Sequence, residues 1–450
     1  MKIRSLLLGS VAAAGLSTGG AYAADLGVLT SLDVCDALGL SGLTISSDTN
    51  CLQITGEVKY VFKWGDYNVP TDVDVDTAKG TFDLIGGDGV NDWDSRFDAW
   101  IKFVATADSD FGPAKAVLKL KQTSHKNTAV NSSYYGTAES YYVTVGSSDT
   151  GGVVLDEAYV SIGDSTVIMA GKKGSIMKKG DDEPLNWLGL FHSEKVDTGV
   201  TWYVDLPDGG HVIQVVSDLG NGISVGAGLE DLNDSSYYER AGTAVGVISY
   251  AGEGISAHAT FAAAGVLDGD IDNWGVHAGF AGTFDNFKVV LAGAFGHDDA
   301  AWTSLSGDYW SVLASASATF DIFTIAGSVE ANYNDEYGAG ASLSATVAEG
   351  VTLNLGGRYY KENSGDDTYQ VAASVSAAVT ESITLTGEIG YLYDEESGYT
   401  ATDAIYGSAK LAWAPGGGYT SSVKATIVSG DNGYEDAGYK IESEFKKTFE

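Results

Sequence analysis

The amino-acid sequence predicts an all-β protein, a transmembrane antiparallel β-barrel, from three observations. Many segments of about 10 to 13 residues alternate apolar and polar side chains, and this is the length that a tilted membrane strand needs. No segment approaches the roughly 18 consecutive apolar residues that a membrane-spanning helix requires. Short turns alternate along the chain with longer polar loops, which is typical of barrels in outer membranes.

The start of the chain has the pattern of a secretory signal peptide. Lys2 and Arg4 form a basic start, Leu6–Leu16 form a short apolar core, and Ala21-Tyr22-Ala23 is a small-x-small cleavage motif. The apolar core is too short to remain as a membrane anchor. We therefore expect residues 1–23 to be removed and the mature protein to start near Ala24, outside the cytoplasm.

The chain contains two cysteines, Cys35 and Cys51. In an oxidising compartment we expect this pair to form a disulfide, which stabilises by roughly 3 kcal/mol when it closes a loop of about 15 residues. A metal site is a poor alternative because no histidine or further cysteine joins the pair. We assign residues 24–50 to a periplasmic N-terminal segment and residues 51–450 to the barrel.

The first three strands after Cys51 have an unusually basic polar face. In the first of them, Val58, Tyr60 and Phe62 alternate with Lys59 and Lys63, and two later segments repeat this pattern. If the polar face lines the lumen, the cations form a basic wall inside the barrel. Alternatively, these side chains only balance acidic neighbours in a wide lumen. The set is Lys59, Lys63, Arg96, Lys102, Lys115, Lys119 and Lys121.

The C-terminal half alternates more regularly. Val371, Ala373 and Val375 are interleaved with Gln370 and Ser374, and similar runs follow one another without a linker. A soluble sandwich would explain the alternation, but it explains the one-sided loop lengths and the aromatic residues beside the short turns less well. Closing the strands into one barrel removes every exposed sheet edge. Pairing the strands by their short turns gives a number nearer to about 20 than to 16.

Two patches resemble a known family. Val34-Cys35-Asp36-Ala37, followed by Cys51-Leu52-Gln53-Ile54-Thr55-Gly56, resembles the start of alphaproteobacterial outer-membrane porins, which are general-diffusion porins. Asp218–Gly222 and Leu229-Glu230-Asp231 resemble a turn and a strand end of the same family. Elsewhere the resemblance is architectural only.

The resemblance implies a trimeric porin in the bacterial outer membrane, with about 16 strands and an inward-folded loop that narrows the pore. The hairpins of this chain allow about 18 to 20 strands instead. The partners that we expect are small hydrophilic solutes and ions inside the pore, outer-membrane lipid and lipopolysaccharide around it, and two further copies of the chain in a homotrimer.

The candidate for the constriction loop runs from Lys172 to Asp197. Its length, mixed charge and aromatic residues Trp187 and Phe191 suggest a loop that packs on a surface. Acidic residues of this loop, facing the basic wall, would create a transverse field across a charged eyelet. An ordinary exposed loop is the alternative. The charged residues are Lys172, Lys173, Lys178, Lys179, Asp181, Asp182, Glu183, Glu194 and Asp197.

Composition and motifs disfavour other classes of function. A formal net charge of −36 disfavours nucleic acid as a partner, because phosphate binding needs a basic face. The six histidines lack metal-ligand spacing, and the sequence contains no Gly-x-Ser-x-Gly elbow. A hydrolytic pair of Ser256 and His258 is disfavoured, since a lone histidine on a strand is usually polar lining. We expect no enzyme, cofactor or metal.

Two functions remain. One is a pore for the passive diffusion of small hydrophilic solutes and ions. The other is a structural or adhesive barrel whose long loops bind partners and whose lumen is plugged, for example by residues 24–50. Nanosiemens conductance steps in planar bilayers would favour the pore.

Overall fold

A computed structural model gives the arrangement of most of the chain. It describes residues 33–67, 74–75, 82–83, 86–87, 92–135, 138–149, 152–179, 183–193, 209–233, 242–269, 271, 273–298, 307–395, 402–431 and 436–449. The predicted signal peptide and residues 24–32 lie outside these ranges. In the part of the chain that is described, no helix is both long and apolar enough to cross a membrane.

The described elements are one short helix and a series of strands. The helix is α2 (Asp33–Ala37). The strands are β1 (Thr44–Ser46), β2 (Asn50–Asp66), β3 (Asp74–Val75), β4 (Phe82–Asp83), β5 (Gly86–Gly87), β6 (Asp92–Ala107), β7 (Ala114–Tyr135), β8 (Ala138–Asp149), β9 (Val154–Gly163), β10 (Thr166–Gly174), β11 (Gly209–Gly220), β12 (Ile223–Glu230), β13 (Thr243–Gly252), β14 (Ile255–Ala264), β15 (Asn273–Phe284), β16 (Phe287–Asp298), β17 (Gly307–Phe320), β18 (Phe323–Asn332), β19 (Tyr337–Ala348), β20 (Val351–Lys361), β21 (Asp367–Thr380), β22 (Ile383–Asp394), β23 (Thr402–Gly416), β24 (Tyr419–Asp431) and β25 (Asp436–Phe449).

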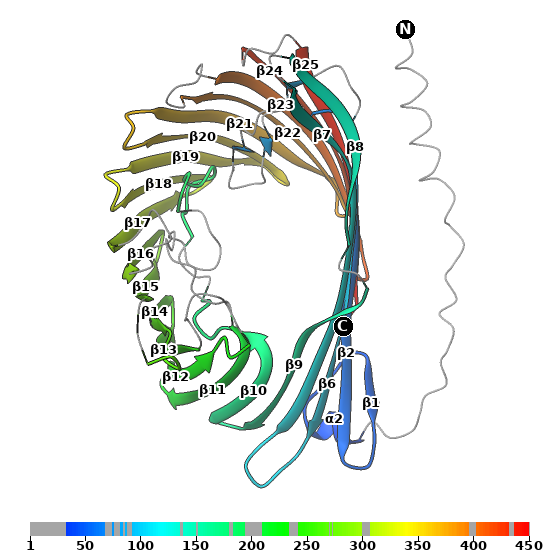
Figure 1. The fold of residues 1–450 in the computed structure, drawn as a ribbon, viewed down its shortest axis with the longest axis vertical. Helices are drawn as coiled ribbons and strands as arrows, with labels where there is room; N and C mark the ends of the chain where they lie inside the picture. Colours follow the sequence, from blue (N-terminus) through cyan, green and yellow to red (C-terminus); the bar gives the residue numbers. More distant parts are fainter. Residues whose placement is uncertain are drawn as a thin grey trace, which may run out of the picture.

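The strands form a closed antiparallel barrel. Within the described residues, 23 strands belong to one sheet, and 20 of them form the ring, to which β1, β5 and β8 are additions. The ring closes where the first long strand, β2, pairs with the last, β25, from Gly56 opposite Phe449 to Asp66 opposite Tyr439. Figure 1 shows this ring in a view through its opening. The fold class is confirmed, but the strand number of 16 taken from the family resemblance is wrong. The higher number from the hairpins is right.

The alternation in the sequence separates the two faces of the wall. On β18, Ile325 and Val329 are 55% and 53% exposed on the outer face, where an apolar surface suits lipid. Ser328 and Glu330, between and beside them, are buried on the inner face. Because the side-chain period of a strand is two, each strand presents one apolar and one polar face.

The short turns that the sequence predicts lie at one end of the barrel. They join β13 to β14, β15 to β16, β17 to β18 and the following hairpins in the same way. Aromatic side chains flank them on the outside, for example Phe287 and Phe320, whose ring centres lie 6.2 Å apart edge to face. Trp413 and Tyr419 form a similar pair at 5.7 Å. This arrangement matches an aromatic girdle at a membrane interface.

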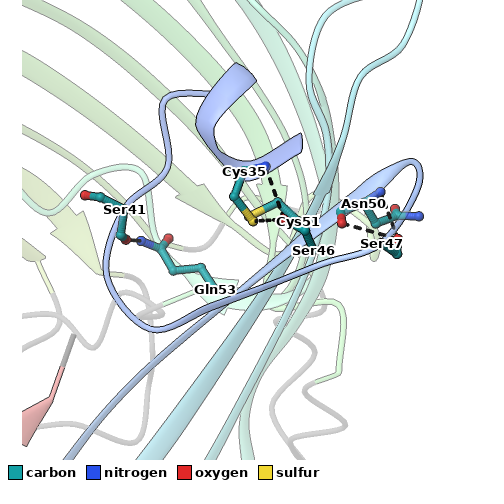
Figure 2. Close-up of a disulfide and its surroundings, with 7 residues drawn as sticks. All are labelled: Cys35, Ser41, Ser46, Ser47, Asn50, Cys51 and Gln53. Carbon is teal, nitrogen blue, oxygen red and sulfur yellow. Dashed lines mark hydrogen bonds between the residues drawn. A yellow bond between two sulfur atoms is a disulfide. The ribbon is translucent and has the colours of Figure 1, made fainter. Parts of the chain in front are cut away.

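A disulfide holds the N-terminal segment to the first barrel strand. Cys35 in α2 and Cys51 in β2 are both fully buried and form the predicted bond, with their Cα atoms 4.9 Å apart (Figure 2). The hydroxyl of Ser46 donates to Cys35 Sγ at 2.9 Å, and β1 pairs with the start of β2. Figure 1 shows α2 and β1 beside the end of β2 at the rim of the ring, so the described part of this segment does not plug the lumen.

One long hairpin interrupts the regular pattern. The C-terminal part of β7 pairs with β8, from Ser124 opposite Asp149 to Tyr135 opposite Ala138. The N-terminal part of β7 pairs with β9. The β7–β9 pairing slips by one residue between Lys119 and Leu120, so Asp156 is an extra residue on β9. This β-bulge changes which acidic side chains reach the lumen.

Candidate functional site

A loop follows β10 and lies inside the barrel. We call residues 175–179 and 183–193 the inner loop; Figure 1 shows this segment inside the ring. Its Leu190 is fully buried and packs against Val290, Ala292 and Leu313. These residues belong to the inner face of β16 and β17, because their neighbours Leu291 and Val312 are exposed on the outside. The loop is therefore packed on the inner wall, as predicted for residues in the range 172–197.

Hydroxyl groups of the inner wall bind the backbone of the inner loop. Leu185 N donates to Ser315 Oγ on β17, and Trp187 N donates to Ser342 Oγ on β19, both at 2.9 Å. Ser328 on β18 donates to the side-chain oxygen of Asn186. These contacts satisfy polar groups that would otherwise be buried without partners.

Glu330 is a buried carboxylate that binds the end of the inner loop. It is 5% exposed on β18 and accepts hydrogen bonds from Phe191 N and His192 N, both at 3.1 Å. Ser193 contributes further bonds from its backbone and its hydroxyl. A buried charge is costly unless it is compensated, and here several donors of the loop compensate it.

Arg358 is a buried cation on β20 that holds the preceding residue of the loop. Its Nη1 donates to the Leu190 carbonyl oxygen at 2.9 Å, and its Nε donates to the Gln370 side chain at 2.8 Å. The guanidinium group lies 3.9 Å from the centre of the Phe191 ring, in cation–π contact. Glu330 and Arg358 thus bind adjacent parts of one loop from different strands.

Ile176 and Leu188 of the inner loop contact other sectors of the wall. Near its start, Ile176 packs against Val245 and Val247 of β13, and Ile176 N donates to Glu230 Oε1 at 3.1 Å. Farther along, Leu188 packs in a cluster with Tyr406, where Trp187 and Phe191 also pack. The loop therefore follows the inner wall from about β11 to β23.

The start of the predicted constriction loop needs correction. Lys172 and Lys173 lie in β10, not in the loop, and point to opposite faces. Lys172 Nζ donates to the Leu155 carbonyl oxygen at 2.6 Å, whereas Lys173 Nζ lies 5.7 Å from the ring of Tyr159 in the lumen. Glu183 is exposed, and Lys178 and Lys179 lie in the inner loop with interactions of their own. The positions Asp181, Asp182, Glu194 and Asp197 lie outside the described residues.

The predicted basic residues share the lumen face of three adjacent strands. The register places Lys59 opposite Asp98, Lys102 opposite Lys119, and Trp100 opposite Lys121. Their sequence neighbours Val58, Tyr60 and Leu118 are exposed on the outer face. The complete set on the inner face is Lys59, Lys63, Arg96, Lys102, Lys115, Lys119 and Lys121.

Most of these cations have an acidic partner, which the prediction of a purely basic wall leaves out. Five of the seven form ion pairs among the described residues: Lys59–Glu444 at 3.0 Å, Lys63–Asp94 at 3.9 Å, Arg96–Asp98 at 2.8 Å, Lys102–Glu157 at 2.9 Å and Lys119–Asp156 at 2.7 Å. Lys115 and Lys121 form no ion pair in the part of the chain that is described. The lumen face of β2, β6 and β7, which we call the ion-paired wall, therefore carries a series of ion pairs and two additional lysines.

The inner loop and the ion-paired wall face each other across the barrel. Along the pairing order of the ring, β18 is ten strands from β7 in both directions. The loop therefore covers the wall diametrically opposite the strand that carries Lys115, Lys119 and Lys121. Glu330 and Arg358, which attach the loop, were not among the predicted residues, although alternation does place both on the lumen face.

The described residues of this arrangement do not include a metal site. Among the described residues, no group of three or more His, Cys, Asp and Glu side chains could hold a metal ion. His258 and His277 stack on neighbouring strands with their ring nitrogens 3.0 Å apart.

A closed barrel with an apolar exterior, a polar lumen and a loop packed inside defines the class of outer-membrane channel proteins. Residues 31–428 match the family model described as the porin subfamily, so the chain belongs to this family. It is a porin of the bacterial outer membrane.

Similar proteins include two porins of Brucella. Porin Omp2b of Brucella suis biovar 1 is 26% identical over 311 residues, which cover 66% of this chain and 74% of that protein. Porin Omp2a of Brucella ovis is 27% identical over 312 residues, covering 66% and 79%. Among solved structures, OccK1 (OpdK) of Pseudomonas aeruginosa matches with a TM-score of 0.44 and 11% identity, covering 88% of this chain and 98% of that one.

Proposed function

We propose that this porin forms a water-filled pore whose narrowest part lies between the inner loop and the ion-paired wall of β2, β6 and β7. The observation that carries the proposal is the attachment of the inner loop to the inner face of β17–β20, opposite the lysines of β7. Small hydrophilic solutes and ions would pass through this gap by passive diffusion and without chemical change.

Charge on the wall would determine which ions pass most easily. Where Lys115, Lys119 and Lys121 line the gap, an anion finds a favourable local potential, and a cation finds carboxylates such as Glu157 nearby. Mixed charge across a narrow gap also orders water, which penalises apolar solutes. The acidic positions Asp181 and Asp182 of the predicted loop would add a negative side to this field.

The test is the reversal potential of single channels in planar bilayers under a salt gradient. Replacing Lys115, Lys119 and Lys121 by glutamate should shift selectivity strongly toward cations, because the wall loses three positive charges and gains three negative ones. The matched control is Lys288→Glu, on β16 next to a short turn and far from β7. Unchanged selectivity in the triple variant would contradict the proposed eyelet.

Conductance also separates this function from an adhesive, plugged barrel. Steps of nanosiemens size are expected for the pore, and liposome swelling with sugars of increasing size would measure its width. The homotrimer implied by the family resemblance, and contact with lipopolysaccharide, stay predictions. Crosslinking in native membranes, followed by denaturing gel electrophoresis, would test the trimer directly.

A further inference from the structure

One aromatic side chain lies among the charged groups of the ion-paired wall. Trp100 of β6 is on the lumen face, directly opposite Lys121 of β7. Side chains of directly opposed residues start only about 5 Å apart at their Cβ atoms. Lys119 is two residues before Lys121 on the same face of β7, and its Nζ lies 5.2 Å from the centre of the Trp100 ring. The half-buried indole of Trp100 therefore lies on the lumen face beside the Lys119 ammonium group, with Lys121 opposite it in the register.

The ion pairs around Trp100 leave one positive charge in excess. Lys102 and Lys119 share Glu157, whose carboxylate oxygens lie 2.9 Å and 3.9 Å from them, and Lys119 also pairs with Asp156 at 2.7 Å. Glu157 lies directly opposite Lys119, and the β-bulge on β9 brings Asp156 to the same side. Lys121 forms no ion pair within the described residues. Asp98 and Asp156 act on its ammonium group electrostatically without forming an ion pair, so this group can still contact an anion from solution.

This group of residues lies on the part of the wall that the inner loop leaves open. The contacts given above attach the inner loop to β13 and β17–β20 and to a cluster that includes Tyr406 of β23, and β7 lies across the ring from β18. A solute that passes the inner loop on its open side therefore passes along β6 and β7. We call Trp100, Lys102, Lys119 and Lys121 the indole–lysine ledge.

We propose that the indole–lysine ledge binds small aromatic carboxylates, with the carboxylate paired to Lys121 and the ring lying on the indole of Trp100. The proposal rests on the proposed function, since the ledge must face an open pore. Lysine supplies charge-assisted hydrogen bonds to a carboxylate. The indole supplies a planar apolar surface that favours stacked or edge-to-face rings, and an inorganic anion cannot use that surface.

The experiment measures block of single-channel current by benzoate. In potassium chloride, added benzoate should reduce the current in a saturable way. Acetate carries the same charge without a ring, and benzamide has the ring without the charge, so neither should block at the same concentration. Lys121→Gln should raise the half-blocking concentration of benzoate about tenfold, which corresponds to one charge-assisted hydrogen bond.

Variants of the tryptophan test the ring contact. Trp100→Leu should also weaken the block, whereas Trp100→Phe should retain most of it because a ring remains. The matched control is Lys410→Gln, which removes a lumen-facing lysine of β23 that lies outside the ledge. Equal block by acetate, or unchanged block in Lys121→Gln, would overturn the proposal. A conducting channel that benzoate does not block would overturn it too and leave the pore intact, whereas the absence of conductance would refute the proposed function itself.

Discussion

Two buried side chains of opposite charge, Glu330 and Arg358, attach the inner loop, and each binds its backbone. Glu330 uses its carboxylate on backbone N–H groups of the loop, and Arg358 uses its guanidinium group on a backbone carbonyl oxygen. Hydrogen bonds to charged groups contribute roughly 1.5–3 kcal/mol each, and a buried charge without a partner costs more. The wall and the loop therefore stabilise each other, and side chains of the wall determine where the loop lies.

Glycine on the lumen face gives the inner loop the room that it needs. A Cβ atom added at Gly340 of β19 would lie 2.6 Å from Asn186 Nδ2 and 3.0 Å from the Gly189 carbonyl oxygen, so the loop would have to move. We predict that Gly340→Val displaces the inner loop and raises the mean single-channel conductance and its noise in planar bilayers.

The control for this variant lies on the same hairpin but on the opposite face. A Cβ atom added at Gly327 would meet only the Gly340 carbonyl oxygen, at 3.8 Å, and would point toward lipid. Gly327→Val should therefore conduct like the original channel. If both variants conduct alike, the inner loop does not narrow the pore.

Sequence reasoning found the cations of the site but not their partners. Strand alternation is a local property, and it places Lys59, Lys102 and Lys119 on one face without any knowledge of the fold. Glu444 lies almost four hundred residues from Lys59, and only closure of the ring brings them together. Asp156 reaches Lys119 through a β-bulge, which strict alternation assigns to the wrong face.

At the scale of elements, the strands were predictable because each carries its own period and its own turn. The hairpins from β13 to β25 therefore gave the right strand number where the family resemblance gave the wrong one. The long β7–β8 hairpin escaped prediction, since the pairing partner of β7 changes from β9 to β8 along one continuous strand. Which strand pairs with which half of β7 is a tertiary property.

The segment bearing α2 and β1 depends on the disulfide more than the barrel does. Its described contacts are with β2, through β1 and through Cys51. We predict that reduction, or the double variant Cys35→Ser and Cys51→Ser, makes residues 33–46 sensitive to protease while β2 and the rest of the barrel stay protected. Limited proteolysis with mass spectrometry, with and without reductant, measures this difference.

If residues 33–46 stay protected after reduction, the pairing of β1 with β2 is enough to hold them. The oxidised protein is the control for proteolysis, and the double variant in the absence of reductant separates loss of the bond from side effects of the reagent. Conductance should not change, because α2 and β1 lie at the rim and not in the opening (Figure 1).

Over the whole molecule, the charges of opposite sign are distributed unequally. The chain has a formal net charge of −36, and many of the acidic residues fall in connections between strands. The seven cations of the sequence prediction lie instead on one inner sector of the barrel. Distant charges act through solvent and are screened by salt, whereas groups that an ion contacts directly are screened much less.

The selectivity of the pore should therefore depend on ionic strength. The Debye length is about 30 Å at 0.01 M salt and about 3 Å at 1 M. At low salt the net negative charge should attract cations to the mouth and favour potassium over chloride. At high salt that field disappears, and Lys115, Lys119 and Lys121 should then increase the relative permeability of chloride. Reversal potentials at a fixed concentration ratio measure the change.

Neutralising the three lysines separates the two contributions. In the variant with glutamine at positions 115, 119 and 121, potassium should be favoured at low salt and the preference should fade at high salt without turning toward chloride, because only the screened field of the net negative charge remains. A permeability ratio that does not change with salt in the original channel would mean that the loop charges do not reach the conduction path. In that case, the lumen wall alone would determine selectivity, and the acidic surface would serve only solvation of the loops.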